Sequence, residues 1–117
     1  MKAGTVLQFA IDRDDSPCFR DVADVALRLA PDMLVFCYSA ATLRSRASLF
    51  VDNFPGAVSY AVKANASPHV LATLAEAGIN VWDVASVGEM RQVRKVSPAA
   101  RFHYHNPIKS RAEIREA

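Results

Sequence analysis

Two charged residues stand in otherwise apolar stretches of the sequence, where their side chains could take part in chemistry. Lys63 ends the stretch 58–63, and Asp83 lies within the stretch 79–85. Burying an ammonium or a carboxylate is costly unless the charge is paired or used. A lysine amine at a strand end could form an imine with a carbonyl group, and Asp83 could line the same pocket and help to set the protonation state of the amine. The structural alternative is that Lys63 reaches solvent or forms an ion pair with Asp83.

The three histidines and the tryptophan are the next residues that could take part in chemistry or serve the structure. His103 and His105 alternate along one predicted strand and therefore face the same side, which is the minimum geometry for a metal pair. Since no third ligand follows at a familiar spacing, we predict no metal site. His69 is expected in the first turn of a helix and exposed to solvent. Trp82 points to the side opposite Asp83 and is expected in the core.

The elements that position these residues follow from periodicity and from proline and glycine breaks. Helices are predicted at 20–30, 39–51, 68–77, 86–96 and from 110 onward, and strands at 32–38, 57–64, 79–85 and 101–105. Gly78 is predicted to end the third helix. Ser86 is predicted to begin the fourth helix, with Glu89 either as its capping-box partner or as a pocket residue.

This alternation of strands and helices indicates an α/β fold with a parallel sheet, either doubly wound or barrel-shaped. We expect the sheet to be buried on both faces. Ligands of such folds collect at the carboxyl ends of the strands, where Lys63 and Asp83 are both expected. Because the last predicted helix begins just before Ala117, we expect the sequence to be the N-terminal part of a longer protein.

The composition excludes several classes of function. The formal net charge is +2 without a basic block, so nucleic-acid binding by charge is not expected. With 51% hydrophobic and 22% charged residues the chain can bury a core. No apolar run is long enough for a membrane span, and acidic residues stand where a signal peptide would be basic, so a cytoplasmic protein is expected. Cys18 and Cys37 are expected to be free, buried thiols.

Three stretches of the sequence, in this order, resemble motifs of the fold-type III, pyridoxal-phosphate-dependent decarboxylases of ornithine, diaminopimelate and arginine. The first and most specific is Tyr60-Ala61-Val62-Lys63-Ala64-Asn65. The others are Val81-Trp82-Asp83-Val84-Ala85-Ser86 with Gly88-Glu89, and His105-Asn106-Pro107-Ile108-Lys109-Ser110. The resemblance covers about residues 34–117.

The resemblance implies a fold, a cofactor and a set of site residues. The fold would be a (β/α)8 TIM barrel of the alanine racemase-like type. Residues 39–117 would form the first part of this barrel, with about three strands, and residues 1–38 would form an N-terminal helix and strand before it. Lys63 would bind pyridoxal 5'-phosphate through an imine, Ala61 and Asp83 would line the cofactor pocket, and Glu89 would interact with the lysine amine once it is freed. The cofactor would act as an electron sink for the carbanion left by loss of CO2.

The resemblance also implies a substrate class and an assembly. The pattern Asn106-Pro107-x-Lys109 is more similar to the ornithine branch than to the diaminopimelate branch, so a bacterial ornithine or lysine/ornithine enzyme is preferred, with conversion of ornithine to putrescine for polyamine synthesis as the expected reaction. His105 departs from the small residue of eukaryotic members. The complete enzyme would be a homodimer, and its phosphate-binding loop would come from later in the chain, so the 117-residue chain is expected to be inactive alone. The alternatives are a same-fold racemase or cofactor-handling protein, a non-catalytic homologue that binds a partner, and a truncated product without function.

Overall fold

A computed structural model describes residues 17–116 of the chain. The chain divides into two compact units between Cys37 and Tyr38, and each is described by itself. Helix α1, Val22–Leu29, belongs to the first unit and confirms the helix predicted at 20–30. The Asp21 carboxylate accepts a hydrogen bond from the Asp24 N–H at 2.8 Å and so caps the free amides of the first turn.

The strand predicted at 32–38 is wrong. Residues 31–39 form neither helix nor strand, and the side chains of Leu34 and Phe36 are 92% and 97% exposed. A strand needs a hydrogen-bonded neighbour, and none pairs with this stretch among the residues that the structure describes. Its apolar composition therefore does not by itself produce a strand.

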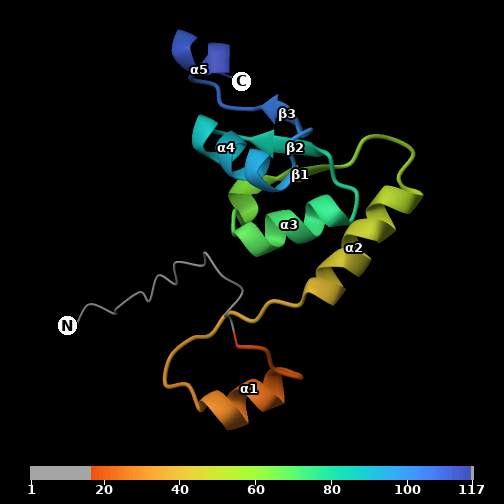
Figure 1. The fold of residues 1–117 in the computed structure, drawn as a ribbon, viewed down its shortest axis with the longest axis vertical. Coiled ribbons are helices and arrows are strands. Elements are labelled where there is room, and N and C mark those ends of the chain that lie inside the picture. Colours follow the sequence, from red (N-terminus) through yellow and green to blue (C-terminus); the bar gives the residue numbers. More distant parts are fainter. Residues whose placement is uncertain (1–16, 117) are drawn as a thin grey trace, which may run out of the picture. The chain divides into compact units, whose positions relative to one another are not determined.

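The second unit alternates helices with the strands of one parallel sheet, whose order is β1-β2-β3 (Figure 1). In chain order its elements are α2 (Ala40–Asn53), β1 (Ser59–Ala61), the 3-10 turn η1 (Val62–Ala64), α3 (Pro68–Glu76), β2 (Val81–Val84), α4 (Val87–Val96), β3 (Arg101–Tyr104) and α5 (Arg111–Glu116). The predicted α/β class with a parallel sheet is confirmed. Three parallel strands with helical crossovers are compatible with the first part of a barrel.

Serine side chains begin the helices of the second unit. The Oγ atoms of Ser39, Ser67 and Ser86 accept hydrogen bonds from the N–H groups three residues later, at 3.2, 3.4 and 3.2 Å. Each bond satisfies an amide that has no partner within its helix. At the other end of α3, Gly78 has a φ of +96°, a conformation that side chains disfavour, so the predicted glycine stop is confirmed.

The helices cover one face of the sheet, where the core lies. Trp82 is fully buried there, as predicted, and packs edge-on against the Tyr60 ring at a centroid distance of 6.1 Å. Leucines of α3, and Met90 and Val93 of α4, belong to the same buried cluster. The opposite face is largely open: Arg101 and His103 are exposed on it, although Val81 of β2 is buried. The expected burial on both faces is therefore wrong for the part of the sheet that is described.

The two cysteines of the chain lie at its surface. Cys18 and Cys37 are both exposed, so the expectation of buried thiols is wrong. Among residues 17–116, none of the helices has the length and apolar character needed to cross a membrane.

Candidate functional site

The open face of the sheet brings together one residue from each strand. Ala61 of β1 is the register partner of Asp83 of β2, and Asp83 is the register partner of His103 of β3. Because side chains alternate along a strand, this row faces away from Trp82 and the covering helices. The row lies near the carboxyl ends of the strands, where parallel α/β sheets bind ligands.

Asp83 is paired with a histidine that the sequence analysis gave no role at this site. The His105 Nδ1 lies 2.8 Å from the Asp83 Oδ1, and the two side chains are 65% and 32% exposed. The His105 N–H donates to the Val84 carbonyl at 2.9 Å, which extends the β2–β3 pairing beyond the last strand residue. The shared parity of His103 and His105, combined with the pairing of the two strands, was the signal that could have predicted this contact.

Lys63 lies beyond the end of β1, within the turn η1. The chain leaves the strand at Val62, which is fully buried, whereas Lys63 is not buried in the sheet but exposed, in line with the alternative in which this side chain reaches solvent. The predicted strand 57–64 is accordingly shorter, since its last residues form this turn. Within the described chain the Lys63 amine has neither a hydrogen bond nor an ion pair, so the alternative of an ion pair with Asp83 is not realised either.

Two hydrogen bonds that involve the Tyr60 and Asn65 side chains hold the segment after Lys63. The Tyr60 hydroxyl donates to the Asn65 carbonyl at 3.1 Å, and the Asn65 Oδ1 accepts from the Ser67 N–H at 2.9 Å. Partial burial raises the pKa of Tyr60 above its ordinary value, so the phenol stays protonated as a donor. These bonds fix the path of the chain from Lys63 into α3.

Glu89 is held against the loop that follows β2. Its Oε2 accepts a hydrogen bond from the Ala85 N–H at 2.7 Å, while the Ser86 Oγ accepts from the Glu89 N–H at 3.2 Å. Ser86 is thus the helix cap that was predicted, but the carboxylate binds the amide before the cap residue and not the amide of the cap itself, as a capping box requires. The Oε1 atom has no hydrogen bond within residues 17–116.

The other two histidines have different surroundings. The ring of His103 lies 5.8 Å from that of His105, and its side chain is exposed. No group of three or more potential metal ligands occurs among the described residues. His69 lies in the first turn of α3, as predicted, but it is half-buried where exposure to solvent was expected, and its Nε2 is buried without a hydrogen-bond partner in the described chain.

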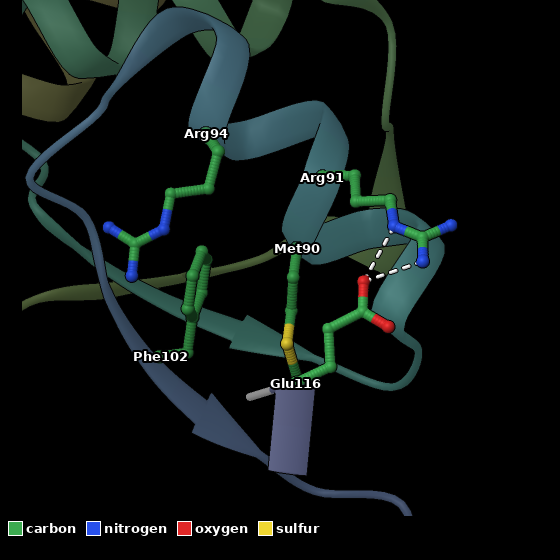
Figure 2. A pocket seen from close by; sticks show the side chains of 5 residues that line it. All are labelled: Met90, Arg91, Arg94, Phe102 and Glu116. Atoms are coloured by element: carbon green, nitrogen blue, oxygen red, sulfur yellow. Dashed lines mark hydrogen bonds and ion pairs between the residues drawn. The ribbon is translucent and has the colours of Figure 1, made fainter. Parts of the chain in front are cut away.

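A hollow of about 250 Å³ lies away from these residues, between α4, β3 and α5 (Figure 2). Its lining comprises Met90, Arg91, Arg94, Phe102 and Glu116. Arg91 forms an ion pair with Glu116 at 2.6 Å, and the Arg94 guanidinium stacks on the Phe102 ring at 4.7 Å (Figure 2). Since Phe102 is on the helix-covered face, this hollow is separate from the row of Ala61, Asp83 and His103.

Comparison with known proteins gives the family. Residues 40–117 match the family model of the pyridoxal-dependent decarboxylases, over their pyridoxal-binding domain. The chain belongs to this family. The chain is also similar to the diaminopimelate decarboxylase of Bacillus subtilis (strain 168), with 37% identity over 89 residues, which cover 71% of the chain and 20% of that relative. It thus spans about a fifth of the relative's length, and no solved structure matches it significantly.

The residues at the carboxyl edge fit the cofactor of this decarboxylase family. Pyridoxal phosphate carries an aldehyde, which a lysine amine binds covalently. Lys63 presents an exposed amine without a competing ion pair in the described chain, two residues after the small side chain of Ala61 on the open face. The Asp83–His105 pair lies on the neighbouring strands.

Proposed function

We propose that Lys63 of this protein binds pyridoxal 5'-phosphate and that the protein decarboxylates a basic amino acid, with ornithine as the substrate and putrescine as the product. The observation that carries the proposal is the exposed, unpaired amine of Lys63 in the pyridoxal-binding domain, at the carboxyl edge of a parallel sheet. Amines at this edge of α/β folds are positioned to meet ligands.

Each site residue has a role that its surroundings support. Lys63 would hold the cofactor through its aldehyde, and its amine would be free again once a substrate amine is bound there. One oxygen of Glu89 accepts a hydrogen bond from the Ala85 N–H, and its second oxygen is available to accept a hydrogen bond from an N–H of the Lys63 amine when that amine is free. Asp83 and Ala61 line the cofactor pocket as register partners on adjacent strands. When bound, the cofactor supplies an electron sink for the carbanion that remains after CO2 leaves.

The substrate proposal depends on the segment after β3. The sequence Asn106-Pro107-x-Lys109 favours ornithine, and the Asn106 Oδ1 accepts a hydrogen bond from the Ile108 N–H at 3.1 Å, which fixes this turn. The similarity to a diaminopimelate decarboxylase favours diaminopimelate as a second candidate. The two substrates differ at the end remote from the reaction, because only diaminopimelate carries a second carboxylate there.

The substrate is tested by supplying the intact source protein and pyridoxal phosphate with carboxyl-labelled ornithine, lysine, arginine and diaminopimelate in turn. Release of labelled CO2 with putrescine as product is expected, with kcat/KM for ornithine at least about tenfold above the others. A higher kcat/KM for diaminopimelate would replace ornithine by the second candidate. Loss of optical activity without CO2 release would instead identify a racemase, and an intact protein without turnover would contradict an enzymatic role.

The assembly and location are part of the same proposal. By resemblance to its family, the intact protein is a homodimer in the cytoplasm, with residues 1–38 leading into the barrel segment 39–117. Sedimentation of the source protein is expected to give twice the mass of its chain. A monomer that is fully active would contradict the proposed homodimer.

A further inference from the structure

Asp83 lies on the middle strand of the sheet, and a candidate partner for its carboxylate follows each of the two neighbouring strands. Its register partners are Ala61 on β1 and His103 on β3. Two residues beyond the first stands Lys63, and two residues beyond the second stands His105. Of these two, only His105 contacts Asp83, at 2.8 Å. Lys63 and His105 thus follow the strands on either side of Asp83, and in this structure only the imidazole is bonded to the carboxylate.

The contact with His105 is held by the backbone as well as by the side chains. The His105 N–H donates to the Val84 carbonyl at 2.9 Å, so the residue is fixed against β2 although its side chain is 65% exposed. His103 shares the same face, and its ring lies 5.8 Å from that of His105, but it makes no bond to Asp83. The geometry therefore distinguishes these two neighbouring imidazoles.

The choice of partner matters for the lysine. A carboxylate that pairs with an amine stabilises its ammonium form, which has no lone pair to attack an aldehyde. A hydrogen bond to an imidazole directs the Asp83 carboxylate toward β3 and leaves the Lys63 amine without an ion pair, as observed. We propose that His105 is a positioning residue that keeps Asp83 from pairing with Lys63 and so keeps the amine available for covalent attachment of the cofactor. This inference rests on the proposed role of Lys63.

The test measures cofactor attachment in the intact source protein, freed of cofactor, at one fixed pH. Pyridoxal phosphate is titrated in, the imine is reduced with borohydride, and the labelled Lys63 peptide is quantified. We expect His105→Ala to weaken attachment about tenfold, and His105→Asn, whose amide replaces Nδ1, to restore it to within about threefold of the wild type. Lys95→Ala, at the exposed end of α4 and outside the row of Ala61, Asp83 and His103, is the control and should change attachment by less than about twofold.

A double-variant cycle tests whether the effect passes through Asp83. In an Asp83→Asn background no carboxylate remains to pair with Lys63, so His105→Ala should cause no further loss. A second readout is the spectrum of 15N-labelled histidine in the cofactor-free protein: the His105 signals should show a proton on Nδ1, and Asp83→Asn should change them without changing those of His103.

The outcomes separate this inference from the proposed function. If the wild type fails to attach the cofactor at Lys63, both are wrong. If the wild type attaches it and His105→Ala behaves like the control Lys95→Ala, only the role of His105 is overturned. The same conclusion follows if His105→Ala remains damaging in the Asp83→Asn background, because its effect then does not pass through the carboxylate.

Discussion

At the scale of single residues, the site depends on which side chains have partners. Lys63 was singled out from the sequence because it is charged among apolar residues, and the structure keeps it at the carboxyl edge but exposes it. The sequence did not predict the partner of Asp83, because that contact needs two strands to be in register. Residue types could therefore be predicted as candidates, whereas their pairing could not.

Lys63→Ala is expected to abolish the absorbance of the covalently bound cofactor and to lower kcat by at least about 10³-fold, since no other group would make the covalent attachment. Absorbance spectra and CO2 release from the intact source protein measure both. Lys95→Ala, at the exposed end of α4, is the matched control and should keep the wild-type spectrum. Survival of the absorbance in Lys63→Ala would mean that another lysine binds the cofactor.

A second prediction at this scale concerns Glu113 at the start of α5. Its carboxylate accepts a hydrogen bond from the Ser110 N–H at 2.7 Å, and this bond, followed by that of the Ser110 hydroxyl, lowers the pKa of Glu113 below 4.5. A lowered pKa stabilises the folded form above 4.5, and this stabilisation is lost as the pH falls through the lowered value.

Ser110→Ala removes only the hydroxyl, so the pKa of Glu113 should rise part of the way toward 4.5. Carboxyl 13C chemical shifts followed against pH give this value. Ser97→Ala, at the end of α4, should leave it unchanged. An unchanged pKa of Glu113 in Ser110→Ala would show that the Ser110 hydroxyl does not lower it.

At the scale of elements, local signals predicted helices well and strands less well. Serine caps, the proline at the start of α3 and Gly78 act within a few residues, so the helices could be placed from the sequence. A strand depends on a partner distant in sequence. The stretch 32–38 has strand-like composition but no partner in the described chain, and β1 stops at Ala61 because Val62 turns into the core.

Ser86→Ala should lower the free energy of unfolding by about 1 kcal/mol, because the Glu89 N–H loses its capping oxygen. Urea unfolding of the protein measures the change. Ser97→Ala is the matched control at the opposite end of the same helix, where no side-chain cap is formed, and should have an effect within about 0.5 kcal/mol of zero. Equal effects of the two substitutions would contradict a capping role for Ser86.

Gly78→Ala and Gly88→Ala should have opposite effects on stability. Gly78 has a φ of +96°, so a methyl group there should cost about 1–2 kcal/mol although space is available, the nearest atom being the Val51 Cγ1 at 3.9 Å. Gly88 lies in α4, where a methyl group would meet only the Ser86 Oγ at 3.7 Å, so alanine should add about 0.5–1 kcal/mol. Urea unfolding distinguishes these signs, and a stabilising Gly78→Ala would contradict the assigned strain.

At the scale of the whole second unit, the sheet has one covered face and one open face. The covered face carries the buried Trp82 and Val84, whereas the candidate site lies on the open face with Asp83 32% and His105 65% exposed. The alternation of side chains along the strands correctly predicted that Trp82 faces the core and that Asp83 faces the opposite side. The sequence could not predict that the site face would be open, because its coverage depends on elements that no local pattern specifies.

The 117-residue chain by itself is therefore expected to show no decarboxylation. The described site residues face solvent on the open sheet face, and catalysis of this kind needs a site that excludes water and fixes the substrate. Labelled CO2 release from the purified chain with pyridoxal phosphate and ornithine measures this. The intact source protein is the positive control, and measurable turnover by the chain alone would contradict the expectation.

The contact between Asp83 and His105 has a consequence for the study of folding. It joins residues 22 positions apart, on two strands whose connection runs through α4. Forming it requires closure of the whole β2–α4–β3 crossover, which is slow compared with forming a helix. The imidazole signal of His105 thus offers a built-in probe for the moment at which these two strands pair during refolding.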